Sequence, residues 1–145
     1  MTEPSEKAST GGSVEFLNPG DLPKNPAYTN VIVVSGSVKT IYIGAQGAFD
    51  AATGTIVGRG DLGAQSMQVM KNIQAALAAA GAGLEHLIKW NIYLVQGQPL
   101  QPGIEAFQRV WGNRPNAPAN TVMYVSELVP ADFLICIDAI AVLPL

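Results

Sequence analysis

The chain has 145 residues, of which 48% are hydrophobic and only 13% are charged, against a usual charged share of about 25%. The length fits one domain, and the low charge indicates that part of its surface is covered by association. Eight Lys and Arg against 11 Asp and Glu give a net charge of −3, which argues against a basic face for nucleic acid. With one Cys and one His, the sequence holds no intrachain disulfide and no Cys-based or multi-His metal site.

The first residues are small and polar and show no periodicity. This pattern predicts a disordered tail over residues 1–13 and a single domain over residues 14–145. The start of the chain lacks the basic residues and apolar core of a signal peptide, and no run of 18 apolar residues is present to span a membrane. We therefore expect a cytoplasmic protein without a membrane partner.

An irregular lead-in over residues 18–26 is rich in Pro, Gly and Asp. After it, two apolar runs, Val31–Val34 and Ile41–Ile43, flank the turn-forming residues 36–39. This arrangement predicts a β-hairpin made of the two runs. Residues 50–54 predict a second turn.

Two helices are predicted in the middle of the chain. Asp61 is a suitable N-cap for a helix that runs to about Ala80, and Gly81 fits the left-handed residue that follows many helices. Pro102 suits the first turn of a second helix, which extends to Trp111. The buried faces, at three-and-four spacing, are Met67, Met70, Ile73, Leu77 and Ala80 in the first helix and Ile104, Phe107 and Trp111 in the second.

Residues 88–94 alternate between apolar and polar side chains, which predicts a half-buried strand, and two more strands are predicted over residues 120–128 and 133–142. The order β-β-α-β-α-β-β is typical of an α+β domain with two helices on one face of a sheet. The last strand is apolar on both faces. Since the helices cover only one of them, we expect other copies of the chain to cover the second.

Several short motifs occur in order from about residue 18 to the C-terminus. They are Tyr42–Gln46, Ala52–Gly54, Gln65, Asn72, Ala79–Gly81, Ile88–Lys89, Ile92–Leu94, Pro118–Ala119 and Asp138–Val142. In these motifs and their spacing, the chain resembles the YjgF/RidA family. The resemblance implies a chorismate-mutase-like fold, a homotrimer and three clefts between subunits. The best-understood members hydrolyse reactive enamines and imines to ketones and ammonia without a metal or organic cofactor, and others have been called translation inhibitors or endoribonucleases.

The chain departs from this family at the site itself. The family's deaminases begin the strand after the second helix with Pro-Ala-Arg-Ser-Cys, and their arginine clamps the carboxylate of an imine derived from an amino acid. Here the segment reads Pro-Ala-Asn-Thr-Val, so Asn120 replaces the arginine and Val122 the cysteine. Cys136 stands where the family has the glutamate thought to position the attacking water. Gly44 stands in place of a serine, with Ala45 after it.

By the same resemblance, Ile104 replaces an asparagine of the second helix, whereas Tyr28 matches a tyrosine of the family. The implied substrate-binding positions are Tyr28, Gly44, Ala45, Ile104, Asn120, Val122 and Cys136, and the candidates for a chemical role are Tyr28, Cys136 and Asp138. Each has a plainer interpretation too. On this plainer interpretation, Tyr28 only closes a loop, Asn120 only begins a strand, and Asp138 has a structural role.

Cys136 lies on an apolar strand with no base near it in the sequence, and His86, the one histidine, lies in a distant turn. A reactive thiolate needs a neighbouring cation, histidine or helix N-terminus to lower its pKa. We therefore expect Cys136 to be passive.

Three functions are consistent with the sequence. The first is hydrolysis of a small neutral or weakly polar enamine, imine or related compound, with water held by Tyr28, Asn120 or the backbone. The second is a regulatory trimer that binds a metabolite without catalysis. The third, an endoribonuclease or translation inhibitor, fits the net charge of −3 least well. The sequence does not separate the first two, and Arg109 and Arg114 are both open as substitutes for the absent arginine.

Overall fold

The structure is a computed structural model, and it describes residues 11–145. The elements in chain order are β1 (Ser13–Leu17), β2 (Val31–Ser35), β3 (Val38–Gln46), β4 (Phe49–Asp50), β5 (Thr55–Ile56), α2 (Leu62–Ala79), a short 3-10 helix (Leu84–His86), β6 (Leu87–Val95), α3 (Gln101–Trp111), β7 (Ala119–Val125) and β8 (Ile135–Pro144). Among these residues, no helix has the length and apolar character needed to cross a membrane. Most of the expected tail, residues 1–13, lies outside the described residues. In its described part, Gly11 forms a bridge with Ser37.

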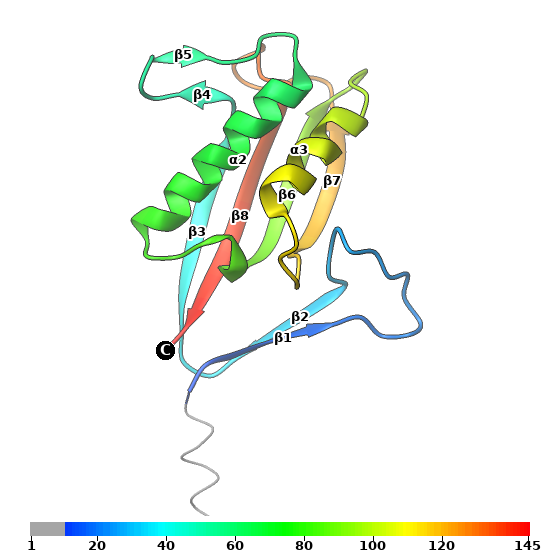
Figure 1. Cartoon of the computed structure of the whole chain (residues 1–145), viewed down its shortest axis with the longest axis vertical. Coiled ribbons are helices and arrows are strands. Elements are labelled where there is room, and N and C mark those ends of the chain that lie inside the picture. The colour runs from blue at the N-terminus through cyan, green and yellow to red at the C-terminus, as the bar shows by residue number, and fades with distance from the viewer. Residues whose placement is uncertain (1–10) are drawn as a thin grey trace, which may run out of the picture.

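The central sheet has four strands in the order β3-β8-β6-β7, and both helices lie on one of its faces (Figure 1). The β6–β7 pair is parallel, and β8 is antiparallel to both of its neighbours. This arrangement confirms the predicted α+β fold. The core fills the space between the helices and the sheet, and every second residue of β8 enters it: Ile135, Ile137, Ala139 and Ala141.

The predicted hairpin of Val31–Val34 with Ile41–Ile43 is wrong. The first run, in β2, pairs with β1 to form a separate two-stranded arm, and the second, in β3, pairs with β8. Figure 1 shows the arm extending away from the central sheet. Two apolar runs around a turn satisfy the local hairpin pattern. The distant strand β8, however, gives β3 a long ladder and an apolar partner that the local pattern does not reveal.

The first helix agrees closely with its prediction. The Asp61 side chain accepts a hydrogen bond from the backbone N–H of Ala64 at 3.1 Å, as an N-cap does. Gly81, with φ +79°, follows the end of α2 in the left-handed conformation. The buried residues of α2 include Val69, Met70, Ile73 and Leu77, whereas Met67 and Ala80 of the predicted face are only half-buried.

Gln65, which is fully buried, fastens the start of α2 to the segment before β8. Its side-chain amide donates to the carbonyls of Gly58 at 3.2 Å and Asp132 at 2.9 Å, and its oxygen accepts from the N–H of Leu134 at 2.8 Å. One side chain therefore satisfies three backbone groups from two distant loops.

We predict that Gln65→Leu lowers the free energy of unfolding by about 2–4 kcal/mol, because the backbone groups it served are left buried without partners. Gln74→Leu, at an exposed position of the same helix, is the matched control and should change stability by less than about 0.5 kcal/mol. Urea denaturation measures both. Equal midpoints for the two variants would contradict the role assigned to Gln65.

Candidate small-molecule site

A cavity of about 740 Å³ lies between α3, the helix-side face of β6 and β7, and the loop that contains Tyr28. Its volume is in the range of small-molecule pockets, roughly 300–1,000 Å³. Apolar side chains from the sheet and α2 form much of its wall: Met70, Trp90, Ile92, Leu94, Ile135 and Ile137. The cavity thus lies on the helix side of the sheet.

Two predicted site residues reach the cavity through the register of β7. Asn120 pairs with Trp90, and Val122 pairs with Ile92. Residues that are opposite one another in a sheet share a face, so Asn120 and Val122 lie on the helix side with the core. Ile104 lines the same cavity from α3.

Tyr28 is brought to the cavity by its neighbour Thr29. The hydroxyl of Thr29, a residue that is only 4% exposed, donates to the carbonyl of Ala117 at 2.5 Å, and its N–H donates to the carbonyl of Pro118 at 3.4 Å. These bonds hold the loop against the residues that precede β7, so Tyr28 lines the cavity together with Asn120. Thr29 is hard to recognise from the sequence, because a threonine in an irregular loop gives only a weak signal.

The other predicted site residues do not line this cavity. Gly44 and Ala45 are exposed on β3, where its register with β8 shifts between Ile43 and Gln46. Cys136 alternates on β8 with core residues and so faces the opposite side of the sheet. Within one chain, the sheet therefore separates these residues from the cavity.

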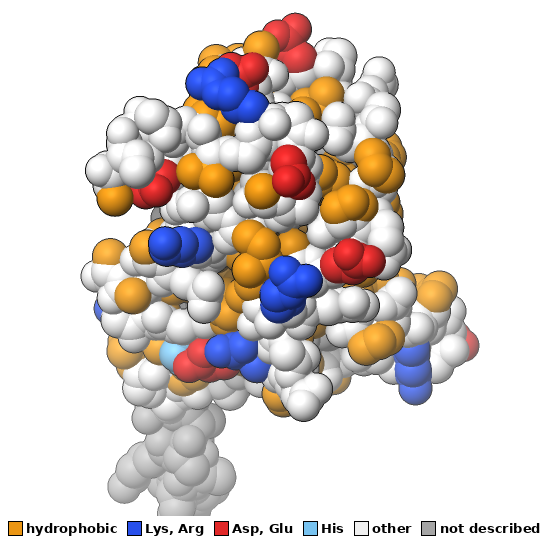
Figure 2. Space-filling model, turned by 45° about the horizontal axis from the view of Figure 1, so that its top comes forward, with side chains coloured by type: hydrophobic (Ala, Val, Ile, Leu, Met, Phe, Trp, Pro, Cys, Tyr) orange, Lys and Arg blue, Asp and Glu red, His pale blue; other side chains and the backbone are white. Residues whose placement is uncertain are grey.

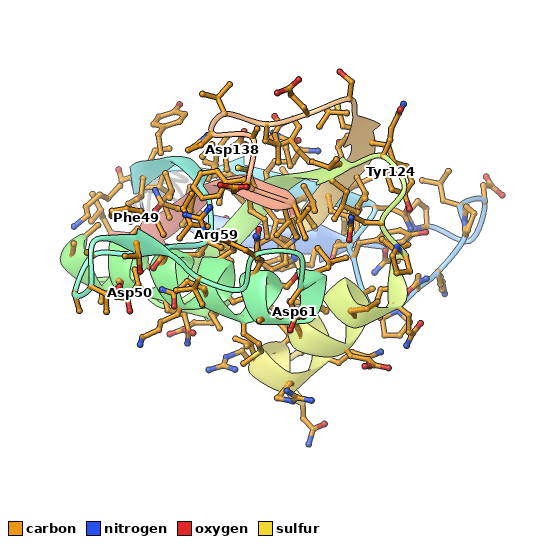
Figure 3. The ribbon with its side chains drawn as sticks, turned by 90° about the horizontal axis from the view of Figure 1, so that it is seen from above. Phe49, Asp50, Arg59, Asp61, Tyr124 and Asp138 are labelled. Atoms are coloured by element: carbon orange, nitrogen blue, oxygen red, sulfur yellow. The ribbon has the colours of Figure 1, made fainter. Side chains whose placement is uncertain are left out.

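Asp138 also lies on the side of the sheet away from the helices (Figure 3). One of its carboxylate oxygens accepts from the Asn91 amide at 2.8 Å and the other from the Tyr93 hydroxyl at 2.9 Å. The bond to Asp138 raises the pKa of Tyr93, and burial and the carboxylate's charge add to this rise. Because both oxygens already have donors, the geometry favours a structural role for Asp138.

Cys136 is buried, and burial raises the pKa of its thiol. A raised pKa keeps the thiol protonated at neutral pH, and the protonated form is a poor nucleophile. Its partner across the β6–β8 ladder is Tyr93, which carries no positive charge. The structure gives Cys136 no activating group within the described part of the chain.

One of the two arginines that were open as substitutes for the absent family arginine lines the cavity. Arg114 is the one charged side chain in its lining. Its guanidinium donates from one nitrogen to the carbonyls of Val110 at 3.1 Å and Trp111 at 3.0 Å. Arg109, the other open substitute for the absent arginine, does not line the cavity. The lining contains no carboxylate and no histidine, and residues 11–145 hold no cluster of three or more His, Cys, Asp or Glu able to bind a metal.

The lining also includes three aromatic rings and a serine. Trp90, Phe107 and Trp111 come from β6 and α3, and Ser66 comes from the buried face of α2. The spacing in the sequence predicted that Phe107 and Trp111 share one face of the second helix. It did not predict that this face lines a cavity. Ser66 could have been noticed as a polar residue four positions after Leu62 and four before Met70, both of which are core residues.

Comparison with known proteins agrees with this fold. The model of the family described as endoribonuclease L-PSP matches residues 22–143. A RutC family protein of Synechocystis sp. is 32% identical over 117 residues, covering 81% of this chain and 86% of its own length. A RutC family protein of Pyrococcus horikoshii is 39% identical over 101 residues, covering 70% of this chain and 77% of its own length. The crystal structure of the Rid-family protein YyfB from Yersinia pestis, a protein of unknown function, superposes with a TM-score of 0.78 at 27% identity, covering 90% of this chain and 98% of that one. The chain belongs to the YjgF/RidA family.

If Cys136 is passive, Cys136→Ser should change ligand binding or turnover only modestly. It should lower stability by about 1–3 kcal/mol, because a hydroxyl in this apolar strand would lack a partner. Cys136→Ala, which adds no polar group, separates this cost from the loss of the thiol. Denaturation curves and assays of the same preparations measure both effects. Loss of all turnover in both variants with ligand binding intact would identify Cys136 as a nucleophile.

Proposed function

We propose that the protein is a homotrimer that binds a small, neutral or weakly polar compound in clefts between its subunits, and that it hydrolyses an enamine, an imine or a related compound there. The observation that carries the proposal is the cavity itself. Tyr28 and Asn120 provide hydrogen-bonding groups within an otherwise largely apolar lining, at an edge of the sheet that a second copy can cover. On this proposal the ligand of the protein is a small molecule. We still expect the protein to be cytoplasmic.

The exposed surface supports assembly. On the side of β7 away from the helices, Met123 is 42% exposed, and on the same side of β3, Tyr42 is 78% exposed. On the helix side of β7, Val122 is 45% exposed. An edge strand with large apolar side chains exposed on both faces is a typical place for association. A neighbouring copy covering this edge would also close the cavity mouth.

Hydrolysis needs a group to position or deprotonate water, and the lining of the single chain has neither a carboxylate nor a histidine. On the catalytic proposal, Tyr28, Asn120 and backbone groups hold the water, and the neighbouring copy adds further groups.

A binding or regulatory trimer without catalysis is the second candidate. The same absence of a carboxylate and a histidine from the lining favours it. A screen for ammonia release from neutral imines and enamines, run beside a binding assay for the same compounds, separates the two candidates. If compounds bind and none of them releases ammonia, the result favours the second candidate.

Ribonuclease activity is the least favoured candidate, although the family description names an endoribonuclease. On the face that Figure 2 shows, the Lys and Arg side chains are scattered rather than gathered into one patch. Binding to phosphates requires clustered cations, and the net charge of the chain is −3.

Light scattering should give a mass near three times the 15.2 kDa of the chain. Met123→Glu places a charge on the face that the trimer would bury and should shift the mass towards that of a monomer while the circular dichroism spectrum stays unchanged. Gln74→Glu, on the exposed side of α2, is the control and should leave the mass unchanged. A wild-type protein that is monomeric at micromolar concentration would contradict both the assembly and the closed cleft.

The protein should hydrolyse 2-iminopropanoate poorly, because Asn120 cannot pair with its carboxylate as an arginine does. The missing charge-assisted bond is worth about 1.5–3 kcal/mol, or roughly a ten- to hundredfold loss in rate. Ammonia release measures the rate. Asn120→Arg alone should not restore it, since Cys136 stands where the family's glutamate would be. Fast turnover by the wild type that Arg114→Gln abolishes would instead place the anion-binding group at Arg114.

A further inference from the structure

The cavity has a polar end and an apolar end, and β7 shows the change between them. Asn120, which is half-buried, and Val122, which is 45% exposed, are successive residues on the helix side of this strand, and both line the cavity. Residues two apart on a strand are separated by about 6–7 Å. The lining of β7 therefore changes from an amide to an apolar side chain within that distance, and both side chains are accessible.

The opposite wall, α3, shows the same change. This helix follows the end of β6 and precedes the start of β7, and the two strands are parallel, so α3 runs antiparallel to both (Figure 1). Leu100 and Ile104, which are 41% and 37% exposed, line the cavity at the beginning of α3, towards the end of β7. Asn113 and Arg114 line it just after α3, towards the start of β7. The apolar residues of both walls thus share one end of the cavity, and the polar residues share the other.

The polar end also includes Tyr28, and two of its uncharged polar groups are free for a ligand. On the other face of the sheet, the amide of Asn91 and the hydroxyl of Tyr93 both bind Asp138. Within residues 11–145, by contrast, Asn120 and Tyr28 form hydrogen bonds through the backbone only. An amide and a phenol can each donate and accept a hydrogen bond. They therefore suit a ligand group that carries both a donor and an acceptor, such as an imine or an amide.

The charge at the polar end favours a neutral ligand group. Arg114 is exposed, and one of its guanidinium nitrogens already donates to the carbonyls of Val110 and Trp111. An ion pair at an exposed position contributes little, because water weakens the attraction. A carboxylate in contact with the half-buried Asn120 would lose hydration without a closely paired charge, which is unfavourable.

An apolar groove extends from the polar end to the beginning of α3. Leu100, Ile104 and Phe107 follow one another at spacings of four and three, so they form a line along one side of the helix. Ile92 and Val122, which are partners in the β6–β7 ladder, lie on the sheet side of the groove. None of these five side chains is fully buried. Because the gain from burial scales with the apolar area covered, this row of side chains favours a linear apolar ligand.

We propose that the cavity binds a neutral imine or amide that carries a linear alkyl chain, with the polar head at Tyr28 and Asn120 and the chain along α3 between Ile104 and Val122. This inference rests on the proposed function, because it assumes that the cavity is a small-molecule site, and it names the substrate class. The rival occupant of the groove is an apolar side chain of the neighbouring copy, which would leave no room for the chain.

A series of amides tests the inference, because amides are stable in water whereas simple imines hydrolyse. Butanamide, pentanamide and hexanamide share the head and differ by one methylene each, and hexanoate has the longest chain with a negative head. Both tryptophans of the sequence, Trp90 and Trp111, belong to the cavity lining, so the intrinsic fluorescence of the full-length protein reports binding. Light scattering on the same samples shows whether the assembly is intact.

The affinity should rise about two- to fourfold with each methylene, and hexanamide should bind more tightly than hexanoate. Val122→Thr and Ile104→Gln, which suit a strand and a helix respectively, should reduce the gain per methylene. Val129→Thr, at a residue that is 91% exposed and outside the lining, is the matched control and should leave the gain unchanged. Asn120→Ala should weaken all three amides by the same factor, about two- to tenfold, and preserve the gain.

Equal affinities for the three amides, or the same loss of gain in Val122→Thr and Val129→Thr, would overturn the inference. Tighter binding of hexanoate than of hexanamide would overturn the neutral head and would point to Arg114. If no amide binds to the intact assembly but a compound from the ammonia-release screen does, the inference fails and the proposed function stands. If no compound of either set binds, both fail.

Discussion

The position of β8 between β3 and β6 is the constraint on which the rest of the structure depends. This strand forms antiparallel ladders with both neighbours, and its alternate residues enter the core beneath α2. Since a strand alternates its side chains strictly, its register also decides which polar groups can meet. Cys136 and Asp138 are fixed on one face and Ile135 and Ile137 on the other, which separates the candidate polar residues of β8 from the cavity.

This separation has a chemical consequence. Asn120 and Tyr28 meet on the helix side of the sheet, while the carboxylate of Asp138 is held on the other side by Asn91 and Tyr93. A reaction that uses both sets of residues therefore needs a second copy of the chain. On the proposed catalytic function, assembly and chemistry would be coupled, because the cavity lining of one chain holds neither a carboxylate nor a histidine.

Local signals in the sequence were sufficient for the helices and most of the central sheet. The cap at Asp61, the glycine at position 81 and the alternation in residues 88–94 each depend on neighbouring residues, and the structure has α2 and β6 at these places. The pairing of β2 was predicted wrongly because its partner, β1, lies in a stretch for which the sequence predicted no strand. Pairing between distant segments is decided by the whole core, which a local pattern does not contain.

The cavity was only partly predictable for the same reason. Resemblance to a family pointed to Tyr28, Ile104, Asn120 and Val122, which do line it. Ser66 and Trp90, which also line it, look like ordinary core positions in the sequence, since one lies on the buried face of a helix and the other on an alternating strand. Only the three-dimensional structure shows that the hydroxyl of Ser66 and the indole nitrogen of Trp90 are buried without a hydrogen-bond partner in the described part of the chain. An apolar residue at either position would fill the core without a buried unpaired group, so these two polar atoms are costly for folding.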